Sequence, residues 1–236
     1  MISDEIAKVI YASLPKEEKL KLALYSDFGE EAQAVYDFIK SPAKESEEVN
    51  VIVQPIHIPG EVLLTDGVYY LYEDGTSEMF DYQKRNAPTK TVKRIGVVMG
   101  SHALAVNLAD YTEQPLTNQK DNTNYAGYIS EYDDAVADWN GKANTEHVKS
   151  IGTGIELKED EWIPSVAELY LIYFNKRSIN AAIQLSGGSH IEDGCYWSST
   201  EGTEIYAWLV DLNDGSLFWY PKNKGDGYVR AVAAFH

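Results

Sequence analysis

Hydrophobic and polar positions alternate through the C-terminal part of the chain, residues 194–235, with the period of two that β-strands have. Turn signals such as Asp214-Gly215 divide this stretch, because Asp-Gly pairs tolerate the positive φ that hairpin turns require. The alternation therefore predicts strands over 195–198, 205–212, 216–220 and 227–233.

The predicted strand 205–212 has two distinguishable faces. Trp208, Val210 and Leu212 share one face, which we expect to point into the core. The alternate positions are expected to point outward: Ala207, Leu209 and Asp211.

Three consecutive aromatic residues, Phe218, Trp219 and Tyr220, interrupt this order in the next strand. Successive side chains of a strand point to opposite faces, so at least one of these rings is expected to be exposed. Pro221 cannot donate to a strand ladder and indicates an edge or a strand end. Aromatic residues among Gly, Asn, Asp and Ser are typical of recognition surfaces. The alternative is that two sheets enclose the rings.

Upstream, the same alternation predicts two further hairpins, and the composition of the long segment 110–130 is typical of an irregular loop. The hairpins comprise 67–72 with 76–80, and 94–99 with 102–108. Helical periodicity occurs in three short amphipathic segments within residues 1–42, which must bury their apolar stripes on each other, on the rest of the chain or on a second copy. A polar linker follows at 41–48, and 49–58 suits a short strand or an extended crossing.

Three helix starts are expected later in the chain. Ser130 with Asp133 can cap a helix that reaches Trp139. Ser165 begins a capping box, and Ser178 can cap a separate helix. Together these elements predict an α+β fold with antiparallel sheets, a few helices and long loops. We divide the chain into a helical segment with its linker, 1–48, and a ligand-binding domain, 49–236.

The net charge of −17 argues against nucleic-acid partners, whose phosphates require clustered Lys and Arg. The sequence has no stretch of about 18 apolar residues, so no membrane insertion is expected. The N-terminus lacks the basic start and apolar run of a secretion signal, which favours synthesis in the cytoplasm, with display on a phage particle or cell surface as one route. A single cysteine excludes an intramolecular disulfide.

Candidate chemistry is sparse, and we predict no catalytic residue, metal ligand or cofactor. The sequence contains no phosphate-binding or zinc-protease motif, and its five histidines are dispersed. Gly187-Gly188 near His190 is explained by a helix stop. The acidic run of Glu156, Glu159, Asp160 and Glu161 is typical of a solvated face. Paired carboxylates of a carbohydrate-active enzyme stay open as an alternative, because sequence spacing cannot measure their separation.

An ordered set of motifs resembles a known family. The motifs are Asp138–Thr145, Trp162-Ile163-Pro164-Ser165, Asn175-Lys176, Ile179-Asn180-Ala181-Ala182, Tyr196-Trp197-Ser198-Ser199-Thr200, Ala207-Trp208, Asp214-Gly215 and Val229-Arg230-Ala231-Val232. Over roughly 60–236 they are similar to the C-type-lectin-fold family that includes the variable proteins of diversity-generating retroelements. Related Bacteroides-type modules of the Legionella collagen-like C-terminal and formylglycine-generating-enzyme-like fold share the pattern.

The resemblance implies a C-type lectin-like fold in which scaffold positions stay constant while outward positions of the last strands vary. It implies scaffold roles for Trp197, Ser198, Ser199, Ala207, Trp208, Val210, Gly215, Val229 and Arg230. It implies a ligand-binding face at Gly202, Thr203, Glu204, Tyr206, Leu209, Asp211, Asn213, Ser216, Phe218, Trp219, Tyr220, Asn223, Asp226 and Tyr228. Calcium-lectin motifs such as Glu-Pro-Asn do not occur, and the paired cysteines of the oxidases are absent, so neither activity is carried over.

These observations favour a non-enzymatic, calcium-independent binding module for a protein or cell-surface ligand, with N-terminal helices for oligomerisation or docking to a carrier. The alternatives are a carbohydrate-active enzyme and a structural subunit of a phage tail or adhesin. A relative that a retroelement does not diversify would have the same sequence features.

Overall fold

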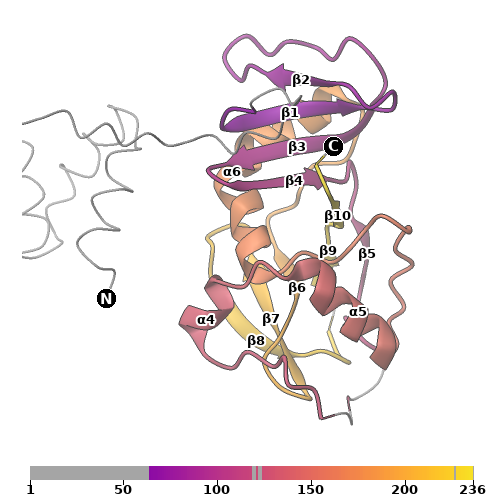
Figure 1. Ribbon diagram of the computed structural model, residues 1–236, viewed down its shortest axis with the longest axis vertical. Helices are drawn as coiled ribbons and strands as arrows, with labels where there is room; N and C mark the ends of the chain where they lie inside the picture. The colour runs from indigo at the N-terminus through magenta and orange to yellow at the C-terminus, as the bar shows by residue number, and fades with distance from the viewer. Residues whose placement is uncertain (1–63, 119–120, 122–123, 226, 236) are drawn as a thin grey trace, which may run out of the picture. The chain divides into compact units, whose positions relative to one another are not determined.

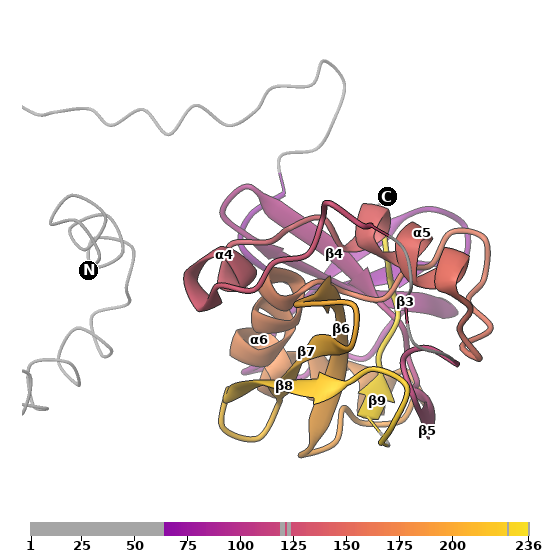
Figure 2. The ribbon, with the colours of Figure 1, turned by 90° about the horizontal axis from the view of Figure 1, so that it is seen from below.

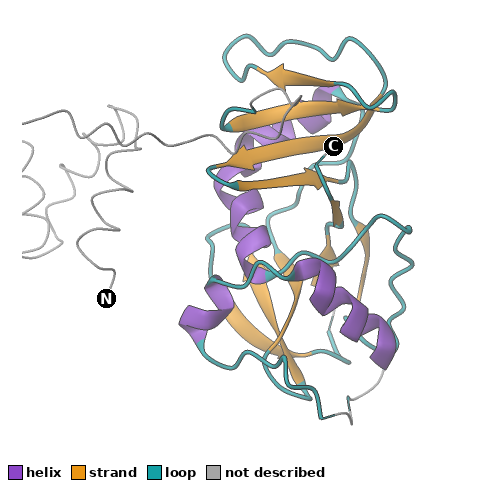
Figure 3. Ribbon diagram, in the orientation of Figure 1, coloured by secondary structure: helices purple, strands orange, loops and turns teal. Residues whose placement is uncertain are grey.

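The computed structural model describes residues 64–118, 121, 124–225 and 227–235, which form two β-sheets and a few helices (Figures 1 and 3). This confirms the predicted α+β class. The expected N-terminal helices, the linker and the segment 49–58 lie outside the described residues. None of the described helices combines the length and the apolar character needed to cross a membrane.

The first sheet is antiparallel and has the strand order β10-β4-β3-β1-β2. Both predicted hairpins are confirmed, and their turns contain Gly75 and Gly100, whose positive φ of 79° and 61° suits glycine. Its strands are β1 (Gly67–Tyr72), β2 (Ser77–Phe80), β3 (Val92–Met99), β4 (His102–Val106) and β10 (Val232–Ala233).

The second sheet has the order β5-β9-β6-β7-β8 and is mixed, because β6 and β9 run parallel. Its strands are β5 (Tyr111–Gln114), β6 (Cys195–Glu201), β7 (Tyr206–Asp211), β8 (Leu217–Pro221) and β9 (Gly227–Val229). Strand β5 corrects the prediction of an irregular loop over all of 110–130. The single strand expected at 227–233 is also wrong, because the chain leaves the second sheet after Val229 and enters the first at Val232.

Helix α6 (Val166–Leu185) packs against strands of both sheets. Its predicted capping box is confirmed: the Ser165 hydroxyl accepts from the Glu168 amide, and the Glu168 carboxylate accepts from the Ser165 amide at 2.8 Å. The prediction of a separate helix starting at Ser178 is wrong. The apolar stripe continues past that position onto Ile179, so tertiary packing favours one continuous helix.

Two shorter helices precede α6. Helix α4 (Tyr132–Val136) begins after Glu131, without a side-chain cap, and ends before Trp139. The predicted cap at Ser130 is wrong, because its hydroxyl donates to the Glu131 carboxylate instead. Helix α5 (Gly141–Ile151), which the sequence pattern did not predict, follows directly.

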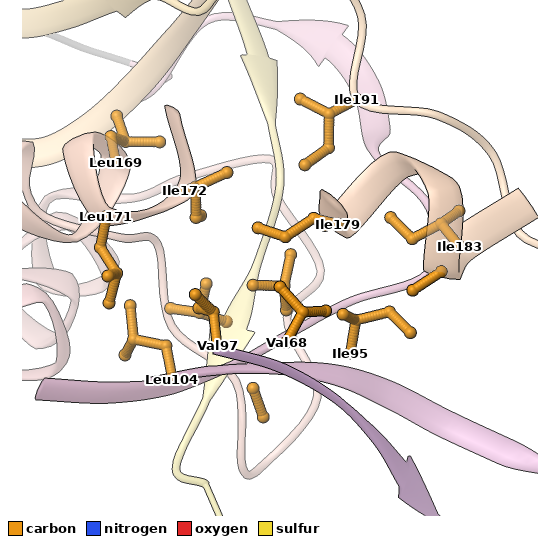
Figure 4. Close-up of a cluster of buried hydrophobic side chains, with 14 of the residues drawn as sticks. Val68, Ile95, Val97, Leu104, Leu169, Leu171, Ile172, Ile179, Ile183 and Ile191 are labelled. Atoms are coloured by element: carbon orange, nitrogen blue, oxygen red, sulfur yellow. The ribbon is translucent and has the colours of Figure 1, made fainter. Parts of the chain in front are cut away.

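The main core lies between α6 and the first sheet. Leu169, Ile172 and Ile179 extend from the helix into one buried cluster (Figure 4). Val68 of β1 and Val97 of β3 meet them from the sheet. Each such side chain contributes roughly 1.5–3 kcal/mol by leaving water. This cluster therefore fixes the helix on the sheet.

A second buried cluster covers the opposite face of the second sheet. It brings Leu116, Val148 and Ile163 against Leu209 and Ala207 of β7. The prediction that Ala207 and Leu209 point outward is therefore wrong. Both faces of β7 are buried. A strand that is covered on both sides has apolar residues on both faces, so its sequence does not distinguish an inner from an outer face.

Candidate functional site

The aromatic residues of β8 are divided between two faces, as predicted. Trp219 and Tyr220 are 38% and 43% exposed, while Phe218 is half-buried and packs against the second core cluster. Strand β8 pairs only with β7 and lies at the edge of the described sheet, which agrees with the prediction from Pro221. The edge position leaves large rings accessible on a strand whose backbone is held on one side.

Trp219 is held by rings on the neighbouring strand. Its indole stacks on Tyr206 with centroids 6.0 Å apart and meets Trp208 edge-on at 5.0 Å. Gly202 lies directly beside it, since a Cβ at that glycine would come within 3.2 Å of the indole. The backbone turn thus provides a flat support for the ring.

Ring contacts continue from the buried Trp208 of β7 onto the helices. Trp208 meets Tyr132 of α4 edge-on at 6.5 Å, and Tyr170 of α6 stacks on Phe174 at 6.1 Å. Tyr170 forms a hydrogen bond with the Tyr132 hydroxyl, and burial together with this bond raises the pKa of Tyr170. Figures 1 and 2 both show α4 beside α6. We call the following residues the aromatic band: Tyr132, Tyr170, Tyr173, Phe174, Tyr206, Trp208 and Trp219.

Parts of this band are strongly exposed. Tyr132 is 53% and Phe174 is 68% accessible to solvent. Large exposed apolar side chains that gather on one part of a protein surface commonly mark an interaction site. The helical part of the band was not predicted, although Tyr170, Tyr173 and Phe174 have the i, i+3, i+4 spacing that places side chains on one helix face.

The predicted binding-face residues do not all come together. Exposed members are Glu204, Asn213, Ser216, Trp219, Tyr220 and Asn223, and half-buried members are Thr203, Tyr206, Asp211, Phe218 and Tyr228. Gly202 is buried beneath Trp219, and Leu209 at 4% exposure belongs to the second core cluster, so its assignment to the face is wrong. Asp226 lies outside the described residues. Tyr228 on β9 is separated from β8 by two strands.

A buried ionic network lies next to the end of β8. The ammonium of Lys222, which is fully buried, contacts the Glu201 carboxylate and lies 4.0 Å from Asp121. His147 from α5 contacts Glu201 through Nδ1, and its Nε2 lies 3.6 Å from Asp121. Tyr125 stacks on the imidazole at 3.5 Å. We call Asp121, His147, Glu201 and Lys222 the Lys222 network.

Three members of this network have atoms that suit a metal ion. One donor atom each from Asp121, His147 and Glu201 falls within 4.8 Å of the others. The Lys222 ammonium already contacts the same carboxylate, so a divalent cation would be repelled by it. We therefore assign the network a structural role: it joins α5, the end of β6 and the residue after β8.

Arg230 forms a second buried ionic centre. Its guanidinium donates to the carbonyls of Asn107, Ser189 and His190 at 2.9–3.0 Å, and its Nε lies 2.5 Å from Asp110. Burial raises the pKa of Asp110, and the nearby Arg230 charge opposes that rise. This arginine fixes the crossing between β9 and β10.

The acidic run at 156–161 is not simply a solvated face. Glu161 is buried and accepts from Asn107 at 2.9 Å and from Tyr111 at 2.6 Å. Asp160 pairs with Arg94 at 2.7 Å, and that bond lowers the pKa of Asp160 to about 2. The expectation of a solvated face is therefore wrong for Glu161.

Glu168 gives a testable pH dependence. Burial raises its pKa to about 7 from an ordinary 4.5, against the lowering effect of hydrogen bonds from Ser165 and Trp162. The folded protein then holds a proton that the unfolded chain releases, so stability is lost as pH rises from about 4.5 to about 7. Glu168→Gln is expected to remove about 3 kcal/mol of that loss. Urea unfolding at a series of pH values measures it, and parallel curves for both proteins would contradict it.

Comparison with known proteins assigns no family to the chain: no family model matches the sequence, and neither does any curated protein.

Proposed function

We propose that this chain is a non-enzymatic, calcium-independent binding module of C-type lectin-like fold whose aromatic band contacts a protein or cell-surface ligand. The observation that carries the proposal is the chain of ring contacts that joins the exposed Trp219 of β8, through the buried Trp208, to the exposed Tyr132 of α4. Tyr and Trp provide large contact areas at low cost in conformational entropy, which is why binding surfaces are rich in them.

The rings are also held in place before any ligand arrives. Trp219 is supported by Tyr206, Trp208 and the Gly202 backbone, and the Trp208 indole donates to the Ile129 carbonyl at 2.8 Å. A surface that is already ordered loses little entropy on binding. This favours the band as a recognition surface.

The lectin-like family and diversification by a retroelement rest on the ordered motifs of the sequence. Diversification predicts a near-copy of the final coding segment downstream of the gene, differing at adenines, beside a reverse transcriptase gene. Sequencing that region tests it. Downstream DNA without such a copy would contradict diversification by a retroelement but would not affect the proposal of a binding module.

Trp219→Ala is expected to weaken ligand binding about 30-fold, corresponding to about 2 kcal/mol for a central aromatic contact. The full chain is first screened against arrays of purified glycans and surface proteins, and each ligand found is titrated against wild type and variant. Met79→Ala is the matched control, because Met79 is comparably exposed on β2 of the other sheet. Equal affinity of wild type and Trp219→Ala would overturn the proposal.

Self-association through the band is the structural-subunit alternative. Sedimentation of wild type and Trp219→Ala distinguishes it. A wild-type oligomer that dissociates in the variant would assign the band to contacts between copies, and a monomer in both cases supports a ligand of another kind.

A further inference from the structure

The helical end of the aromatic band borders a groove whose wall is mostly apolar and aromatic. The groove has a volume of about 520 Å³ and lies where α4, α6 and the β7–β8 turn meet. Its walls include Tyr132, Trp139, Tyr170, Tyr173, Phe174 and Asp214. The volume is that of a typical ligand site. We call it the α4–α6 groove.

The charged residues described in and next to the groove are acidic. Among the described residues of its wall, Asp214 alone is charged, and hydrogen bonding from Ser216 lowers the pKa of Asp214, so the carboxylate stays ionised. Helix α4 adds the exposed Asp133 and Asp134 next to Tyr132. His102 stacks on Trp139 at 3.5 Å, but burial lowers the pKa of His102 and keeps it neutral near pH 7.

Aromatic faces and a carboxylate together favour a cation. The face of a Tyr, Phe or Trp ring attracts a cation that lies within about 6 Å of its centre. A neutral apolar group would contact the rings but would gain nothing from the exposed Asp214 carboxylate. A cation is attracted both by the carboxylate and by the ring faces.

The guanidinium of arginine suits this combination best. It is planar, stacks on aromatic faces and is more weakly hydrated than an ammonium, so it enters a ring-lined groove at a lower cost. Tyr132 belongs both to the groove and to the aromatic band. Its ring contacts Trp208 of β7 and so connects the groove with that strand. One partner can therefore cover both surfaces.

We infer that the α4–α6 groove receives an arginine side chain of a protein partner, stacked on its rings and paired with Asp214. This inference rests on the proposed function, since it identifies the partner that the band contacts as a protein with an exposed arginine.

The test uses the full chain and two capped tripeptides, Gly-Arg-Gly and Gly-citrulline-Gly, which have side chains of similar shape but different charge. Binding is followed by NMR shifts of the Trp139 indole, and choline serves as a small quaternary ammonium for comparison. We expect the arginine peptide to bind at least about tenfold more tightly than the citrulline peptide. Asp214→Asn and Phe174→Leu should remove that preference.

The outcomes separate the two proposals. Trp219→Ala lies outside the groove and should leave peptide binding unchanged while it weakens the macromolecular ligand. Equal binding of both peptides, or binding of neither, would overturn the arginine site even if Trp219→Ala still weakens binding of the macromolecular ligand. Choline binding without any preference for arginine over citrulline would assign the groove to a small ammonium compound and also overturn the inference.

Discussion

Replacing Lys222 with methionine is expected to lower the free energy of unfolding by about 3–5 kcal/mol, the usual cost of removing one partner from a buried ion pair. The change leaves Glu201 and Asp121 buried without the ammonium between them, while methionine keeps most of the side-chain volume. His147 contacts both carboxylates and can compensate only in part. Urea denaturation of wild type and variant at neutral pH measures the loss.

Lys224→Met is the matched control, because Lys224 is exposed two residues further along the same turn. It should change stability by less than about 0.5 kcal/mol. Adding Glu201→Gln to Lys222→Met should restore part of the loss, since it removes one of the two uncompensated charges. A loss below about 1 kcal/mol for Lys222→Met would contradict the structural role of the network.

Arg230→Met is expected to destabilise the fold by a similar amount, about 3–5 kcal/mol. It removes the donors to the carbonyls of Asn107, Ser189 and His190 and leaves Asp110 without its counter-charge. Thermal or urea unfolding gives the value.

Arg230→Lys separates charge from hydrogen bonding at this position. Lysine keeps a positive charge for Asp110 but cannot reach three carbonyls in the planar geometry of a guanidinium. We expect the free energy of unfolding of Arg230→Lys to lie between those of wild type and Arg230→Met. An Arg230→Met protein as stable as wild type would show that the crossing between β9 and β10 does not depend on the arginine.

Local signals in the sequence predicted several elements correctly. The hairpins around Gly75 and Gly100 follow from glycine in tight turns, and the capping box at Ser165 depends only on residues within one helical turn. Three consecutive rings at 218–220 required an exposed aromatic residue, because a strand alternates its faces.

Features set by tertiary packing could not be predicted in the same way. Leu209 is buried because the second cluster covers a face that the sequence pattern predicted to point outward, and the helix passes Ser178 because its buried stripe continues. Tyr132 joins the band only because α4 lies against β7. Residues so far apart in the sequence give no spacing signal.

The Lys222 network depends on tertiary packing in the same way. Asp121, His147, Glu201 and Lys222 come from four separate segments, and each residue type alone is ordinary in an acidic chain. Their convergence is a property of the fold. The dispersed histidines therefore gave no sign of a shared ionic centre.

Hydroxyl-radical footprinting of the full chain, with and without a ligand recovered from the array screen, tests the aromatic band most directly. It reports the solvent exposure of individual side chains. We predict that bound ligand reduces the reactivity of Tyr132, Phe174 and Trp219 and leaves Met79 on the other sheet unchanged. Protection of Met79 with unchanged reactivity of the three rings would place the ligand elsewhere and contradict the proposed role of the band.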